Sequence, residues 1–83
     1  MYYIYVIQSE SQNWRYVGMT NDIRRRFHEH NSGFVRATRN KMPFKLVYLE
    51  KISTRIEARN REKWLKSGYG REYIKNQIGN IPR

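Results

Sequence analysis

Three short runs rich in aromatic and β-branched residues predict β-strands. The first run covers residues 2–8 and the second covers 14–19, with the polar stretch 9–13 between them as a hairpin loop. A third run covers 44–50 and begins directly after Pro43, a residue that fits the start of a strand. The pattern therefore predicts a hairpin followed, later in the chain, by one further strand.

The alternation of side chains along a strand predicts which residues share a face. If the first two strands pair so that opposed residue numbers sum to an odd value, Tyr5 and Tyr16 lie on one face. Gly18 then lies on that face too and leaves room beside Tyr5. In the third strand we expect apolar residues on both faces, Leu46 and Tyr48 on one and Val47 and Leu49 on the other.

The segment 22–31 is predicted to be a helix. One of the three polar residues Thr20, Asn21 and Asp22 is expected to be its N-cap, and Gly33 lies near the C-cap position. The loop that follows, 32–42, is basic.

Two more helices are expected after the third strand. Ser53 or Thr54 is predicted to cap the first of them, and Thr54 and Glu57 have the spacing of a capping box. This helix is expected to run to about Ser67, where two glycines interrupt it, and a last helix covers 71 to about 78. The order ββαβαα predicts an α+β fold.

The length and composition narrow the class of protein. We expect the 83 residues to form a single domain, 1–83, with a loose C-terminal end at about 79–83. The absence of cysteine excludes disulfides and thiolate metal sites. The chain has no run of about 18 apolar residues, and its N-terminus has the pattern of a strand rather than a signal peptide. We therefore expect a cytoplasmic protein.

The charge points to a polyanionic partner. Seventeen Lys and Arg stand against seven Asp and Glu, a net charge of +10, and the basic residues are spread along the whole chain. Nucleic acid is the favoured partner because phosphate contacts release counterions and supply affinity. A membrane surface is disfavoured, since no lysine-rich amphipathic helix with a wide apolar face is present. Charge alone does not separate an enzyme from a basic RNA-associated protein.

Glu62 is the first candidate for chemistry. Ala58 and Leu65, the small and apolar residues of its helix, lie four positions before it and three after it, so Glu62 is expected at the edge of the buried stripe. Spacing alone favours an ion pair with Arg59 or Lys66. Because acids are scarce in this chain, a carboxylate aimed toward the first helix is also a candidate ligand for a hard cation.

Arg26 and His30 lie one helical turn apart, beside the stripe formed by Ile23 and Phe27. Both could reach one phosphate, Arg26 through its guanidinium fork and His30 as a donor or acceptor. The simpler alternatives are a solvated or phosphate-backbone arginine and a histidine that stabilises the helix C-terminus.

Tyr5 and Tyr16 complete the set, although a strand tyrosine is by itself usually a packed aromatic. The candidates for contacts with the nucleic-acid backbone are the basic residues Arg25, Arg36, Arg39, Lys41 and Lys45.

These positions together resemble the GIY-YIG nuclease superfamily, and among its members the small single-domain bacterial proteins. Tyr3-Ile4-Tyr5 and Tyr16-Val17-Gly18 match its two signatures. The segments from Thr20 to His30 and from Glu57 to Gly68 follow in the expected order, so the resemblance covers nearly the whole chain. Tyr3 stands where the family name has glycine, and the asparagine found late in the family has no clear counterpart.

The resemblance implies a three-stranded antiparallel sheet flanked by helices. It also implies a single divalent cation, Mg²⁺ or Mn²⁺, held by Glu62. Tyr5 and Tyr16 would match the signature tyrosines that orient or activate water, Arg26 the phosphate-stabilising arginine, and His30 an assisting histidine.

The favoured function is thus a metal-dependent endonuclease of low sequence specificity. DNA is its preferred substrate, and a protein partner is a possible source of specificity. The alternatives are a non-catalytic nucleic-acid-binding module that acts with a partner and a basic RNA-associated protein.

Overall fold

The computed structural model describes residues 1–79, which form one three-stranded sheet and three α-helices in the order ββαβαα. Strand β1 (Tyr2–Ser9) is central, β2 (Arg15–Thr20) and β3 (Phe44–Ile52) flank it, and both pairings are antiparallel. The predicted fold class is confirmed. The expected loose end at 79–83 lies almost entirely outside the described residues.

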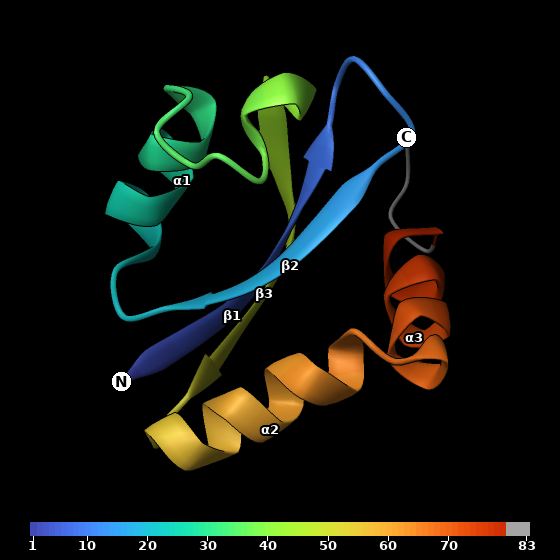
Figure 1. Cartoon of the computed structure of the whole chain (residues 1–83). Coiled ribbons are helices and arrows are strands. Elements are labelled where there is room, and N and C mark those ends of the chain that lie inside the picture. Colours follow the sequence, from blue (N-terminus) through green and yellow to red (C-terminus); the bar gives the residue numbers. More distant parts are fainter. Residues whose placement is uncertain (80–83) are drawn as a thin grey trace.

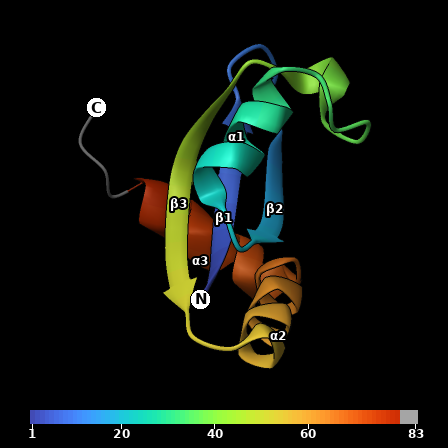
Figure 2. The same ribbon diagram turned by 90° about the vertical axis from the view of Figure 1, so that its left-hand side faces the viewer.

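The helices cover both faces of the sheet. Helix α1 (Ile23–Asn31) lies in front of the sheet in Figure 2, and α3 (Gly68–Gly79) lies behind it. Helix α2 (Arg55–Leu65) runs across the end of the sheet below β2 in Figure 1 and joins α3 on the same face. A short 3₁₀-helix, η1 (Arg39–Lys41), interrupts the long loop between α1 and β3. Among the described residues, no helix combines the length and the apolar character that crossing a membrane requires.

The central strand is buried on both faces, which explains its unbroken apolar run. Ile4 and Val6 pack against α2 and α3, together with Ala58, Leu65 and Ile74. Tyr5 and Ile7 point to the other face, where they form a second core with Phe44 beneath α1. Each of the four β1 side chains is at most 1% exposed. The domain therefore has two small hydrophobic cores, one on each face of β1.

The helix caps follow the sequence closely. The Asp22 side chain accepts a hydrogen bond from the Arg25 amide at 3.1 Å, and Thr54 accepts one from the Glu57 amide at 3.2 Å. Helix α1 ends where Gly33 takes a φ of +80°, the left-handed conformation that favours glycine.

Two local predictions were wrong. Helix α3 begins at Gly68 rather than residue 71, because the Ser67 hydroxyl accepts a hydrogen bond from the Gly70 amide and caps the first turn. A register shift opposite Val6 and Ile7 breaks the alternation of β3, so Val47 and Tyr48 pack against the same core.

Gly18 allows β2 to lie close to Tyr5. The two residues are direct partners in the antiparallel pairing, which has the odd-sum register. A Cβ on residue 18 would overlap the hydroxyl and ring of Tyr5, whose side chain lies across this position. The absence of a side chain at Gly18 therefore fixes where the Tyr5 hydroxyl can sit.

We expect Gly18→Ala to lower the free energy of unfolding by about 1–3 kcal/mol, because the added methyl group overpacks a buried aromatic ring. Chemical denaturation monitored by circular dichroism measures the change. Gly68→Ala is the matched control, since no atom lies within 4 Å of the Cβ position at residue 68. Equal stabilities for Gly18→Ala and Gly68→Ala would contradict the packing of Tyr5 over Gly18.

Candidate active site

A buried chain of hydrogen bonds joins β1, α1 and the following loop. The Tyr5 hydroxyl lies 2.8 Å from Nε2 of His30, and Nδ1 of His30 lies 2.8 Å from the Thr38 hydroxyl. Tyr5 is 1% exposed, and His30 and Thr38 are fully buried. Every buried polar side-chain atom of the described residues has at least one hydrogen-bond partner, so no polar atom of these three side chains is left unpaired.

The direction of the chain follows from what each group can donate. The Arg26 guanidinium lies beside the Tyr5 hydroxyl and can only donate, so the Tyr5 proton is directed to His30 Nε2. Nδ1 then carries the histidine proton and donates it to Thr38, whose own hydroxyl points to the Val35 carbonyl at 3.4 Å. His30 is therefore neutral, with its Nε2 lone pair facing Tyr5.

Burial sets the protonation states of this chain. It raises the pKa of Tyr5 to about 12, against the opposing effect of the nearby Arg26 charge. Burial, reinforced by the positive charge of Arg26, lowers the pKa of His30 to about 4. Both groups are uncharged at neutral pH.

Aromatic rings surround His30. Its ring centroid lies 5.6 Å from that of Tyr5, 5.2 Å from that of Tyr16 and 6.1 Å from that of Phe44. The two tyrosine rings are 6.4 Å apart, and Tyr16, on the edge strand β2, is the more exposed of the two. The sequence-predicted pairing of Tyr5 and Tyr16 on one face is confirmed.

Arg26 lies at the mouth of this cluster. Its side chain is 35% exposed and pairs with Glu29 of the same helix at 3.1 Å. Its positive charge opposes the effect of burial on the pKa of Tyr5 and adds to the effect of burial on the pKa of His30. His30, by contrast, is fully buried, and its two ring nitrogens are hydrogen-bonded to Tyr5 and Thr38.

Glu62 approaches from the other side of the sheet. It lies on α2 between the buried residues Ala58 and Leu65, as the helical spacing predicts, and its side chain is 22% exposed. Burial is the main cause of the raised pKa of Tyr5, and the Glu62 charge adds slightly to it. Glu62 also pairs with Lys66 at 3.4 Å, the ion pair that spacing alone favoured.

The described side chains near Glu62 could hold a metal ion only through a single carboxylate. Residues 1–79 contain no group of three or more His, Asp or Glu side chains that could hold an ion. A cation at Glu62 would therefore have one carboxylate from the protein and would need water and substrate oxygens for the rest. That is how Mg²⁺ is commonly held.

The five predicted nucleic-acid contacts are not equivalent. Arg25 and Arg36 are exposed, while Arg39 donates to the Gly33 carbonyl. Lys41 donates to Gln12 and lies over the Trp14 ring. Lys45 follows the buried Phe44 and so points to the opposite face from Tyr5.

Sequence reasoning missed Thr38. It lies in a basic loop without periodicity, and nothing in its surroundings along the chain marks it as buried. Only the folded loop brings its hydroxyl to His30.

A family model and several related proteins each match most of this chain. Residues 1–76 match the model of the GIY-YIG catalytic domain. The chain is 39% identical over 72 residues to a UPF0213 protein of Haloquadratum walsbyi, which covers 86% of this chain and 79% of the relative. It is 36% identical over 67 residues to a UPF0213 protein of Clostridium perfringens, and the match covers 80% of this chain and 71% of that relative. The UPF0213 protein YazA of Bacillus subtilis is 33% identical over 66 residues, and the match covers 78% of this chain and 66% of that relative. No solved structure matches the chain significantly.

Stability should fall as the pH drops from 6.5 toward 4. Because the pKa of His30 is lowered to about 4 in the folded protein, only the unfolded chain takes up a proton in this window. The loss amounts to up to about 3 kcal/mol, measured by denaturant unfolding at a series of pH values. His30→Gln should flatten this slope, whereas His28→Gln, at an exposed position of the same helix, should keep it. An unchanged slope in His30→Gln would show that His30 is not the responsible group.

Thr38→Val should lower the free energy of unfolding by about 1–3 kcal/mol, because it leaves the Nδ1 proton of His30 without an acceptor in a buried site. Thr38→Ser keeps the hydroxyl and is the matched control. Thermal unfolding of the three proteins makes the comparison. The hydrogen bond has no importance for stability if the Val variant is as stable as the wild type and the Ser variant.

Proposed function

This chain belongs to the GIY-YIG catalytic-domain family, and we propose that it is a divalent-metal-dependent endonuclease that hydrolyses the phosphodiester bonds of DNA. The observation that carries the proposal is the buried Tyr5–His30 hydrogen bond with the Arg26 guanidinium beside it. Glu62 lies on α2, the helix that packs against β2 from the opposite face of the sheet. The net charge of +10 supports a polyanionic substrate.

Arg26 is the proposed phosphate ligand. Its guanidinium is partly exposed at the mouth of the cluster, and its partner Glu29 is itself one-third exposed, so a phosphate can compete for it. The fork of N–H donors matches two non-bridging oxygens. It would neutralise the charge that develops on phosphorus during displacement.

Tyr5 and His30 form the proposed proton path. The Tyr5 oxygen has a lone pair for a hydrogen bond from the attacking water while its own proton is held by His30 Nε2. A bound phosphodiester would offset the Arg26 charge that depresses the pKa of His30, which makes His30 a better acceptor for the proton. Tyr16, the more exposed tyrosine, orients the water from the substrate side.

Glu62 is the proposed ligand of the divalent cation. A cation held there would offset phosphate charge and make a bound water more acidic. Lys66 must release the carboxylate first, which costs little because a partly exposed pair of this kind contributes about 0–1 kcal/mol. With a single carboxylate, metal binding should depend on the presence of the substrate.

The Glu62–Lys66 ion pair also supports a second candidate function, a nucleic-acid-binding module without turnover. In that case Lys66 would take the place of the metal and keep the carboxylate paired. The two functions differ in whether cleavage can be observed at all.

Glu62→Gln should abolish cleavage of plasmid or branched DNA in the presence of Mg²⁺ or Mn²⁺, with a loss of at least about 100-fold. Binding of the same DNA in EDTA should be kept, because the substitution removes a negative charge from the binding face. Gel-based cleavage and fluorescence anisotropy measure the two properties.

Glu72→Gln, at an exposed position on α3, is the control with the same charge change. Cleavage that survives in Glu62→Gln would remove Glu62 from the metal site. Binding without cleavage of any DNA or RNA by the wild type would favour the binding module.

A further inference from the structure

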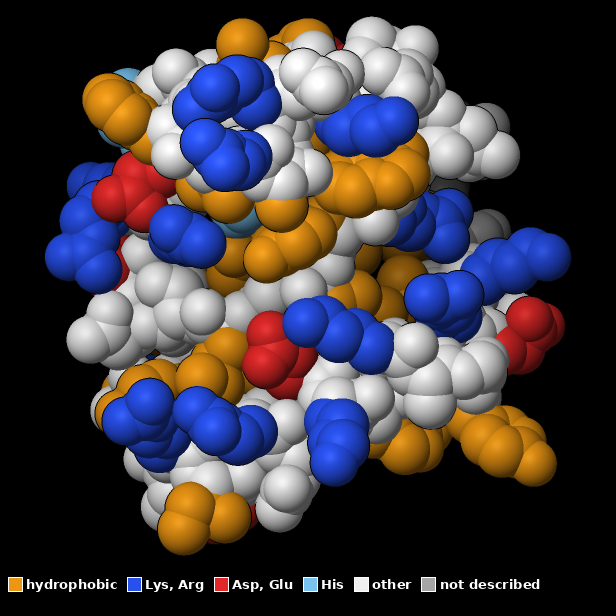
Figure 3. Space-filling model, in the orientation of Figure 1, with side chains coloured by type: hydrophobic (Ala, Val, Ile, Leu, Met, Phe, Trp, Pro, Cys, Tyr) orange, Lys and Arg blue, Asp and Glu red, His pale blue; other side chains and the backbone are white. Residues whose placement is uncertain are grey.

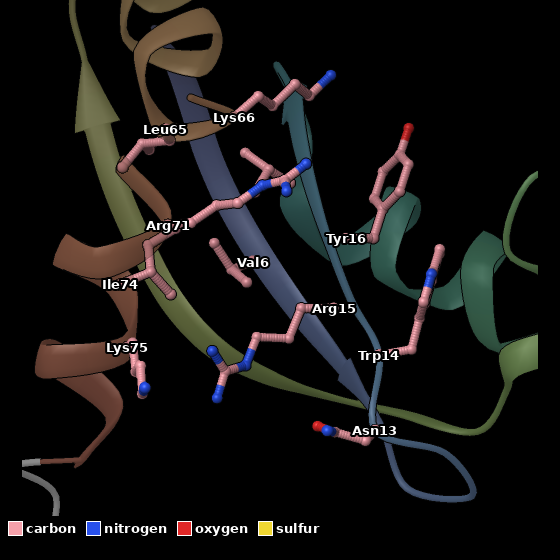
Figure 4. Close-up of a pocket in the computed structure, with 11 residues that line it drawn as sticks. Val6, Asn13, Trp14, Arg15, Tyr16, Leu65, Lys66, Arg71, Ile74 and Lys75 are labelled. Atoms are coloured by element: carbon pink, nitrogen blue, oxygen red, sulfur yellow. The ribbon is translucent and has the colours of Figure 1, made fainter. Parts of the chain in front are cut away.

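A basic hollow lies beside the proposed active site, between β2 and α3. It has a volume of about 740 Å³ and an apolar floor that includes Val6, Leu65 and Ile74. Figure 4 shows Arg15 reaching from β2 toward α3 and Arg71 reaching from α3 toward β2, so the two side chains close over the floor from opposite sides. In Figure 3 blue side chains surround a recessed orange region on this face of the molecule.

The rim of the hollow is strongly positive. Its charged residues are Arg15, Lys66, Arg71 and Lys75, of which Lys66 is paired with Glu62, and no acidic residue lines it. Arg71 and Lys75 are exposed one turn apart on α3, and within residues 1–79 neither has an ion-pair partner. Like charges at this spacing destabilise a helix slightly, so a bound anion would relieve their repulsion.

The hollow continues into the proposed active site around the edge of β2. Trp14 and Tyr16 also line it, from the far side of this strand in Figure 4, and their rings are stacked with centroids 6.2 Å apart. The Tyr16 ring is in turn 6.4 Å from that of Tyr5. Because β2 is an edge strand, no other strand separates the two surfaces.

We propose that this hollow binds the strand that flanks the scissile phosphodiester, in single-stranded form. The inference rests on the proposed function and extends it by naming the substrate class. Phosphates would lie against Arg71, Lys75 and Arg15, and the strand would cross the β2 edge at Trp14 and Tyr16. Aromatic rings beside a basic groove are the usual recognition elements for single strands. The volume of about 740 Å³ and the stacked Trp14 and Tyr16 rings suit individual nucleotides of a single strand. The preferred substrate is then DNA with a single-stranded tail, gap or flap.

The test is the double variant Arg71→Gln/Lys75→Gln, measured by anisotropy with a fluorescent single-stranded oligonucleotide in EDTA over a range of salt. Two lost phosphate contacts should weaken binding about 25-fold at about 0.1 M salt and lower the salt slope by about 1.4. Arg55→Gln/Arg59→Gln has the same charge change at exposed positions of α2 and should bind nearly as the wild type does. Circular dichroism checks that both double variants are folded.

Each outcome bears on the proposal. A loss of affinity confined to Arg71→Gln/Lys75→Gln supports it. Equal losses in the two double variants, or none in either, would overturn it, because net charge and not the hollow would then govern binding. An equal loss with blunt duplex would overturn the single-strand assignment. Since the assay contains no metal and requires no cleavage, it can succeed even if the chain has no nuclease activity.

Discussion

The hydrogen bond between Tyr5 and His30 is the constraint on which the rest of the site depends. It links the central strand to α1 through the core between them, and both groups are almost completely buried. An unpaired hydroxyl or imidazole in this position would cost several kcal/mol, about as much as such a small domain can spare. Gly18 on one side and Thr38 on the other complete the arrangement, the first by leaving space and the second by accepting the remaining proton. The same hydrogen bonds therefore stabilise the fold and hold the proposed catalytic Tyr5 in place.

The second constraint is the position of β2 at the edge of the sheet. Tyr5 lies on the face that α1 covers, whereas Glu62 belongs to α2, which packs against the other face. Their side chains can therefore approach each other only around an edge or an end of the sheet. Helix α2 runs across the end of the sheet below β2 (Figure 1). Its residues Ala58 and Leu65, on either side of Glu62, pack with Val17 and Met19 of β2. The same open edge connects the tyrosine face to the basic hollow beside α3. A cation, a phosphate and a flanking strand could thus be bound along one continuous surface, although the domain has a core of few residues.

Much of the fold and of the candidate site could be predicted from the sequence. The features that could not be predicted have identifiable physical causes. The strands, α1 and its cap follow from local patterns, and the odd-sum register places Gly18 opposite Tyr5 as expected. The irregularity at Val47 and the early start of α3 at Gly68, which Ser67 caps, depend on hydrogen bonds that leave no periodic signal. Thr38 is buried only because its loop folds over α1. For Glu62, spacing fixed the edge position but favoured the ion pair, and the structure contains that ion pair together with the electrostatic influence on Tyr5.

The central claim is that the His30 ring is neutral and carries its proton on Nδ1, because every role proposed for Tyr5 depends on a free lone pair on Nε2. A long-range ¹H–¹⁵N correlation spectrum of the imidazole at pH 6.5, the ordinary pKa of histidine, measures it directly. The account predicts a neutral ring with a protonated Nδ1 and a bare Nε2, unchanged as the pH is lowered to about 5. A doubly protonated ring at pH 6.5, or a proton on Nε2, would contradict it, because Tyr5 would then have no acceptor for its proton.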